Sequence, residues 1–158
     1  MPIEHTHPRW QQAQFMRRIV RFVGRKPGEA FLLLRMAAWV ALLSFLIRLL
    51  PLPRVLSLIA DTTGDRRPRN ARMTQQRLAQ LVDALLGLNL LCFTPTCWKR
   101  APVLHRYLAL YGIKTRIVFG VRKGEETLLA GHAWLEADGR PLLEASPPQY
   151  TPTYSFPA

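Results

Sequence analysis

The chain has 158 residues, of which 49% are hydrophobic and 20% are charged, so it is long and apolar enough to form a packed domain. This composition excludes a disordered chain, and two cysteines, Cys92 and Cys97, are too few for a disulfide-rich scaffold. The net charge of +12 comes from 22 Lys and Arg against 10 Asp and Glu. Such an excess permits an anionic partner but does not select among nucleic acid, a membrane surface and an acidic protein.

The first half of the chain has the periodicity of helices. Apolar residues recur at helical spacing over residues 15–22, and residues 29–50 are predicted to form a long apolar helix that ends at a proline pair. A short helix is expected over residues 53–59. The turn-rich, basic sequence of residues 61–70 predicts an exposed loop, and leucines at helical spacing predict another helix over residues 74–88.

The most apolar stretch, residues 36–47, lies between Arg35 and Arg48. Twelve residues reach about 18 Å as a helix, whereas a bilayer core requires about 30 Å. We therefore predict a buried helix, with membrane contact that is at most peripheral. The N-terminus has no apolar region of the kind that signal peptides carry, so we expect a cytoplasmic protein with reduced thiols.

The second half predicts one helix followed by strands. The helix is expected over residues 97–111, with Gly112 at its C-terminus and with Pro102 inside it as a source of a kink. Three antiparallel strands are predicted over residues 114–121, 127–137 and 140–145. The tail, residues 146–158, holds four prolines and is expected to be extended coil. Helices followed by an antiparallel sheet predict an α+β fold.

A cysteine and a histidine in these elements have the arrangement that a cysteine nucleophile needs, while on spacing alone an inert, buried structural cysteine stays the alternative. Cys97 begins a predicted helix, with Thr94 or Thr96 as its N-cap, and the positive end of the helix dipole stabilises a thiolate. Arg100 adds positive charge. His132 lies in the middle of a predicted strand, where its imidazole could take the thiol proton and later protonate the leaving amine.

The acid that orients His132 depends on the register of the hairpin that follows it. A two-residue loop at 138–139 places Ala145 opposite His132. A three-residue loop at 137–139, with a glycine in the G1-bulge position, instead places Glu144 there, with the Cβ atoms about 5 Å apart. Both loops are permitted, and only the second puts an acid on the histidine face. We therefore predict the three-residue loop and Glu144 as the third catalytic residue.

Two further residues are candidates for substrate binding. Trp134 lies on the same strand face as His132, where it could shield the His–acid pair, form a wall for the substrate or simply pack within the sheet. Arg100 could bind the substrate backbone or hold the helix start against an acid such as Glu136.

Other polar residues are given structural roles. Cys92 is interpreted as a core residue and His105 as a solvated helix residue, because C-x4-C with one nearby histidine is weak as a zinc motif. The backbone N–H of Cys97 is a candidate oxyanion donor, with Asn89 as a candidate second donor.

These residues resemble the transglutaminase-like cysteine peptidases of lasso-peptide biosynthesis, and most narrowly the standalone leader peptidase equivalent to the C-terminal half of the B protein. The family's Cys, the Arg three residues on and the Gly fifteen residues on are matched by Cys97, Arg100 and Gly112. Its His-Ala-Trp and following Glu are matched within residues 132–136. The family's acid, twelve residues after the His, is normally Asp and here is Glu144, which leaves either a working Cys–His–Glu triad or a weakened enzyme.

The resemblance spans about residues 30–145 and implies a papain-like core over residues 74–158. This core follows a helical N-terminal region over residues 1–73, whose basic linker covers residues 61–73. The implied activity is removal of the leader from a ribosomally made lasso-peptide precursor. The implied partners are that precursor, a small leader-binding protein and an ATP-dependent cyclase. Thiol acyl transfer itself requires neither nucleotide nor metal, so no cofactor is expected.

Two other classes stay open. One is another transglutaminase-like protein, catalytic or degenerate, without leader peptidase activity. The other is a basic, non-enzymatic module that binds RNA or a membrane. No aromatic-basic RNA signature is present, so nucleic acid is not an expected partner.

Overall fold

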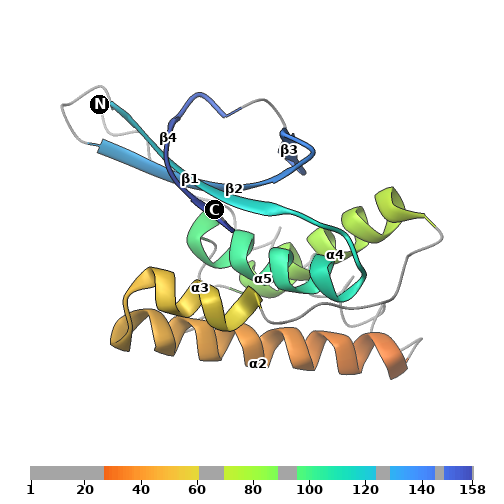
Figure 1. Cartoon of the computed structure of the whole chain (residues 1–158). Helices are drawn as coiled ribbons and strands as arrows, with labels where there is room; N and C mark the ends of the chain where they lie inside the picture. The colour runs from red at the N-terminus through yellow and green to blue at the C-terminus, as the bar shows by residue number, and fades with distance from the viewer. Residues whose placement is uncertain (1–26, 61–69, 89–95, 124–128, 145–147, 158) are drawn as a thin grey trace, which may run out of the picture.

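The computed structural model describes residues 27–60, 70–88, 96–123, 129–144 and 148–157. In chain order its elements are α2 (Pro27–Leu49), α3 (Leu52–Ala60), α4 (Ala71–Leu86), α5 (Cys97–Leu110), β1 (Arg116–Lys123), β2 (Leu129–Ala137), β3 (Arg140–Leu142) and β4 (Thr151–Phe156). Helices precede an antiparallel sheet, which confirms the predicted α+β class (Figure 1). The helix predicted over residues 15–22 and most of the predicted loop at 61–70 lie outside the described residues.

The sheet has the strand order β3-β2-β1-β4, and all of its pairs are antiparallel. β4 corrects the sequence prediction, because residues 151–156 form an edge strand rather than coil. An edge strand tolerates Pro152, since one side of the strand has no partner for a backbone N–H. The β1–β4 register also shifts between Phe119 and Gly120, next to the position that Pro152 faces.

The β2–β3 hairpin differs from the predicted register. Ala137 pairs with Arg140, so the loop has two residues, Asp138 and Gly139, with φ of 50° and 71°. Positive φ at both positions is the signature of a type I′ turn, which matches the twist of the flanking strands. The predicted three-residue loop is therefore wrong. β3 ends after three residues, and Leu143 then adopts a left-handed conformation with φ of 61°.

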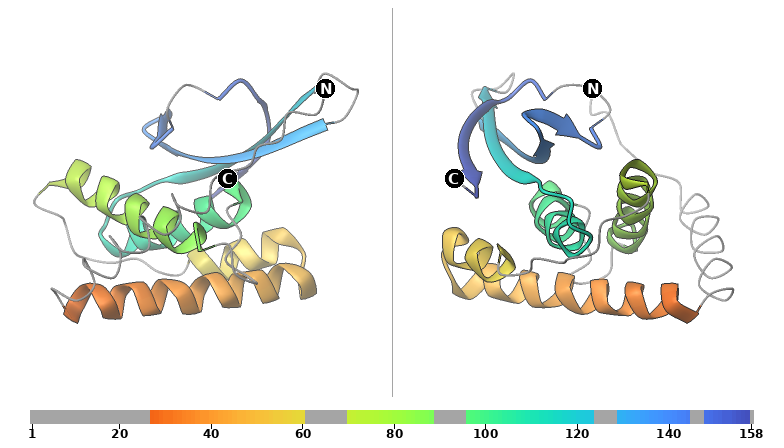
Figure 2. Two further views of the ribbon diagram at one scale, coloured as in Figure 1. Left: turned by 180° about the vertical axis from the view of Figure 1, so that it is seen from behind. Right: turned by 45° about the vertical axis from the view of Figure 1, so that its right-hand side comes forward.

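The helices lie in layers on one side of the sheet. α5 lies between the sheet and α2, and α2 is the outermost helix of the described chain (Figures 1 and 2). α4 packs on α5, and α3 folds back along α2 after Pro51. Apolar side chains from every helix and from the two central strands meet in one core, which includes Val40, Leu56, Val82, Leu104 and Ile117.

α5 is ended by Gly112, as predicted. With φ of 69°, Gly112 occupies the left-handed position after the helix, and its N–H donates to the carbonyl of Ala109. The N–H of Ile113 donates to the carbonyl of Leu108, which completes a Schellman motif. The helix continues through the fully buried Pro102 despite the missing backbone donor there.

The prediction that the apolar stretch of α2 is buried also needs correction. Its buried face carries Met36, Val40 and Leu43, but only 17% of its most apolar window is buried, so the helix is not enclosed by the core. By length and composition, residues 28–49 would suffice to cross a membrane. The opposite face exposes large apolar side chains: Phe31, Leu34, Leu42, Phe45 and Leu49.

Candidate active site

Cys97 is the first residue of α5. Thr96 precedes it in the extended conformation of an N-cap, and the Thr96 carbonyl accepts hydrogen bonds from the N–H groups of Lys99 and Arg100. The Thr96 side chain forms no capping bond. The thiol of Cys97 is half-buried and not in a disulfide. It therefore lies at the positive end of the helix dipole, where the sequence predicts the nucleophile.

His132 lies in the middle of β2, opposite Gly120 of β1. α5 and β2 are in contact, and the contact includes the immediate neighbours of both predicted catalytic residues. A Cβ atom on Gly131 would lie 3.9 Å from the ring of Trp98. The ring of the residue after Cys97 thus lies beside the residue before His132. The fold brings together the helix start and the strand that the sequence predicts to act together.

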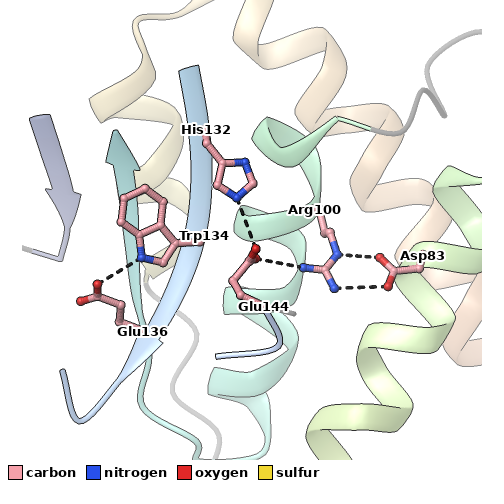
Figure 3. Close-up of polar contacts among 6 residues, drawn as sticks. All are labelled: Asp83, Arg100, His132, Trp134, Glu136 and Glu144. Atoms are coloured by element: carbon pink, nitrogen blue, oxygen red, sulfur yellow. Dashed lines mark hydrogen bonds and ion pairs between the residues drawn. The ribbon is translucent and has the colours of Figure 1, made fainter. Parts of the chain in front are cut away.

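Glu144 reaches His132 even though the hairpin has the shorter loop. The Nε2 atom of His132 lies 3.4 Å from Oε2 of Glu144, within reach of an N–H···O hydrogen bond (Figure 3). The contact is possible because β3 stops at Leu142 and the left-handed Leu143 redirects the chain. The predicted acid is therefore beside the histidine, but for a different structural reason from the one that the sequence suggested.

Arg100 connects this pair to the helices. Its Nη1 atom lies 3.7 Å from Oε1 of Glu144, and its Nε and Nη2 atoms donate to the two carboxylate oxygens of Asp83 at 2.6 and 3.2 Å (Figure 3). Burial lowers the pKa of Arg100, but the hydrogen bond to Asp83 and the charges of both acids outweigh burial and raise the pKa above its ordinary value. A permanent cation is thus fixed one helical turn from Cys97.

The acids that Arg100 contacts differ from the acid suggested by the sequence. Glu136 instead accepts hydrogen bonds from Arg116 at 2.9 Å and from Nε1 of Trp134 at 3.1 Å. Because the Arg100 guanidinium is held by Asp83 and by Glu144, its contacts favour the structural role over substrate binding.

Trp134 supports the histidine from the same face of β2. The two rings are stacked, with centroids 5.9 Å apart and an interplanar angle of 16°. Trp134 is only 3% exposed, which favours shielding of the His–acid pair over a broad contact with substrate. Its ring packs onto Gly120, where an added Cβ would lie 2.9 Å from two ring carbons. A glycine at that position is therefore needed for the ring to lie flat against β1.

Tyr150 is the residue of this site that sequence reasoning missed. Its ring centroid lies 5.1 Å from that of His132 and 6.4 Å from that of Trp134. The guanidinium of Arg122 lies over the same tyrosine ring, 5.1 Å from its centroid. The sequence signal was the alternation of polar and aromatic residues over 153–156, which predicts a strand. Tyr150 directly precedes that strand, β4, whose pairing with β1 places Tyr150 beside the histidine.

His105 is buried, which corrects the prediction of a solvated helix residue. Its Nδ1 atom lies 2.9 Å from Oγ1 of Thr115, and its ring meets the edge of Phe156. Burial lowers its pKa below the ordinary value. These contacts belong to the interface between α5 and the sheet, so His105 is a structural residue rather than a second base.

The site has the parts of an acyl-transfer centre. Glu144 faces Nε2 of His132, which leaves Nδ1 as the nitrogen for a thiol proton. Within the described ranges, no group of three or more His, Cys, Asp or Glu side chains could hold a metal ion. Cys92, the candidate second oxyanion donor Asn89 and the alternative N-cap Thr94 lie outside the described residues.

Comparison with known proteins gives one match. A family model described as the transglutaminase-like superfamily matches residues 39–155, which includes both predicted catalytic motifs, β1 to β3 and all but the last residue of β4. No curated protein and no solved structure matches the chain.

Proposed function

Because the chain belongs to the transglutaminase-like superfamily, which includes cysteine peptidases, we propose that it is a cysteine peptidase with Cys97 as nucleophile, His132 as base and Glu144 as acid. The contact of 3.4 Å between His132 and Glu144 is the observation that carries this proposal. A histidine that contacts an acid through one ring nitrogen, on a strand that packs against the helix begun by a cysteine, fits the arrangement that nucleophilic catalysis uses.

In the proposed reaction, Nδ1 of His132 accepts the proton of the Cys97 thiol, and the thiolate sulfur attacks the carbonyl carbon of the scissile peptide. The negative charge of Glu144 stabilises the imidazolium that forms. The imidazolium then protonates the leaving amine as the C–N bond breaks, which leaves a thioester on Cys97. Water, deprotonated by the same imidazole, hydrolyses the thioester and regenerates the thiol.

The substrate that we propose is a ribosomally made lasso-peptide precursor, from which the enzyme removes the leader. The spacing of Cys97, Arg100 and Gly112 and the His-Ala-Trp motif at 132–134 support this substrate, because they follow the pattern of lasso leader peptidases. The proposal places the protein in the cytoplasm, where the precursor is made. The core peptide released would pass to an ATP-dependent cyclase.

The decisive test compares two cysteine variants on the same precursor. We expect Cys97→Ala to abolish leader cleavage and Cys92→Ala to keep most of it, as measured by mass spectrometry of the released leader and core. Cys92 is a matched control because it is the other cysteine of the chain. Substantial cleavage by a folded Cys97→Ala protein would end the peptidase proposal. A wild-type Cys97 that alkylates readily but releases no leader would instead favour another transglutaminase-like activity.

The proposed leader-binding partner is tested by comparing the rate of precursor cleavage with and without it. We expect the chain to process the precursor slowly alone and much faster with a small leader-binding protein, which would dock by pairing with a strand edge. Equal rates with and without that protein would show that the chain recognises the leader by itself.

A further inference from the structure

The outer face of α2 carries a stripe of apolar side chains that the described part of the chain leaves uncovered. Five large apolar residues on this face are between 43% and 68% exposed: Phe31, Leu34, Leu42, Phe45 and Leu49. Ala38 and Ala41, both exposed, fill the same face between them. At a rise of about 1.5 Å per residue, the stripe is about 27 Å long.

This stripe is the opposite side of a helix that also has a buried apolar side. Met36, Val40 and Leu43 face the core, so α2 is apolar all round. A helix of that kind occurs where both sides meet an apolar environment. The core supplies that environment for one side only, and an exposed stripe of this length is far larger than the scattered apolar residues of ordinary surfaces.

The charges around the stripe are positive. Arg35 and Arg48 are exposed and lie on the two edges of the stripe. At about 100° per residue around the helix axis, Arg35 lies about 40° from Phe31 on one side and Arg48 about 100° from Phe31 on the other. Glu29 is the sole acid in residues 27–60, and it is buried in an ion pair with Arg77. No exposed acid therefore opposes the two arginines on this helix.

The sequence that leads into α2 has the same sign. Residues 1–26 hold six Arg or Lys and one acid, and five of the six basic residues lie within residues 17–26, directly before the helix. A long apolar stripe edged by arginines and adjoining a basic segment fits a membrane surface that contains anionic lipids. The arginine side chains can reach the headgroups while the stripe enters the acyl boundary.

We infer that the outer face of α2 binds the surface of an anionic membrane, with the helix lying in the plane of the interface. A spanning orientation does not fit the fold, because α2 contacts α3, α4 and α5 through its other face. Crossing the bilayer would separate α2 from those helices and expose the Glu29–Arg77 ion pair and the core residues Met36 and Val40. This inference does not depend on the proposed peptidase activity.

The test measures co-flotation of the full chain with vesicles of phosphatidylcholine alone and of phosphatidylcholine with 30% phosphatidylglycerol. We expect the chain to float with the anionic vesicles, more weakly with the neutral ones, and to dissociate in high salt. Phe31→Gln combined with Phe45→Gln should reduce the partition coefficient at least about tenfold, since both rings are more than half exposed and contribute little to the core. Arg48→Gln should reduce binding to anionic vesicles about fivefold and leave binding to neutral vesicles unchanged.

The matched control removes the same kind of exposed apolar surface elsewhere. Met73 on α4 and Leu129 on β2 are 63% and 73% exposed, and the double variant Met73→Gln with Leu129→Gln should float like the wild type. Failure of the folded wild-type chain to bind anionic vesicles would overturn the inference. So would a soluble dimer that the Phe31→Gln/Phe45→Gln variant converts to a monomer, because the stripe would then be covered by a second copy. Resistance of the bound chain to high salt and to carbonate extraction would overturn the interfacial orientation.

Discussion

Replacing Glu144 with Gln removes the negative charge beside His132 while keeping the size of the side chain. The carboxylate lies 3.4 Å from Nε2, and the His132 and Glu144 side chains are 25% and 18% exposed. At that distance the Coulomb energy of two unit charges is about 5 kcal/mol for an effective dielectric constant of about 20, and about 1 kcal/mol in bulk water. Partial exposure and the nearby Arg100 reduce the larger figure. About 3–4 kcal/mol of lost transition-state stabilisation corresponds to a fall in kcat of about 10²–10³-fold.

The assay is single-turnover cleavage of the precursor, with the folded state of each variant checked by circular dichroism. Asp138→Asn is the control, because it removes an acid from the same hairpin at an exposed position where φ is 50°, a conformation that Asn readily adopts. Its rate should equal that of the wild type. Glu144→Asp should keep partial or full activity, since it keeps the charge. A folded Glu144→Gln enzyme with the wild-type rate would refute the assignment of Glu144. An inactive Asp138→Asn variant would show that Asp138, and not Glu144, is the acid on which the reaction depends.

Three further predictions follow from the packing. Burial lowers the pKa of His105 below its ordinary value of 6.5, so the folded protein binds a proton at this residue less readily than the unfolded chain does. The free energy of unfolding, measured by urea titration, should therefore fall as the pH drops below 6.5. His105→Gln should reduce this dependence on pH. Gly120→Ala should lower stability by about 1–3 kcal/mol, seen as a lower Tm, because its Cβ would clash with the Trp134 ring. Arg100→Met should lower kcat with KM unchanged, whereas a raised KM would indicate contact with the substrate.

Local patterns predicted the helices of the described residues and the central strands. Glycine at 112 and the alternation in residues 127–137 depend on nearby residues alone, and the structure has the expected helix end and strand. The edge strand at 151–156 was missed because prolines argue against strands in general, while the position at the edge that makes Pro152 acceptable is a tertiary property. The exposure of α2 was missed for a similar reason, because apolar composition does not reveal how much of a helix its neighbours cover.

The hairpin shows how Glu144 comes to lie beside His132, as predicted, although the loop differs from the predicted one. Strand pairing treats residues 140–145 as one straight strand, and on that assumption only a three-residue loop brings Glu144 opposite His132. The structure uses the two-residue loop and then bends at Leu143, whose φ of 61° is uncommon for a non-glycine residue. Nothing in a leucine's side chain signals that conformation, so the bend could not be read from the sequence.

The ion pair between Arg100 and Asp83 has a consequence for how variants of this protein are interpreted. Asp83 lies on α4, Arg100 on α5 and Glu144 beyond β3, so the alignment of the His132 ring depends on how two helices dock against the sheet. In the proposed peptidase, a substitution deep in the helical layer, with no contact to any reacting atom, is therefore expected to slow the chemical step by moving the Glu144 carboxylate away from His132. We therefore expect heating to abolish turnover of the proposed peptidase before the chain unfolds, because loosened packing of α4 and α5 would move Arg100 and Glu144 first.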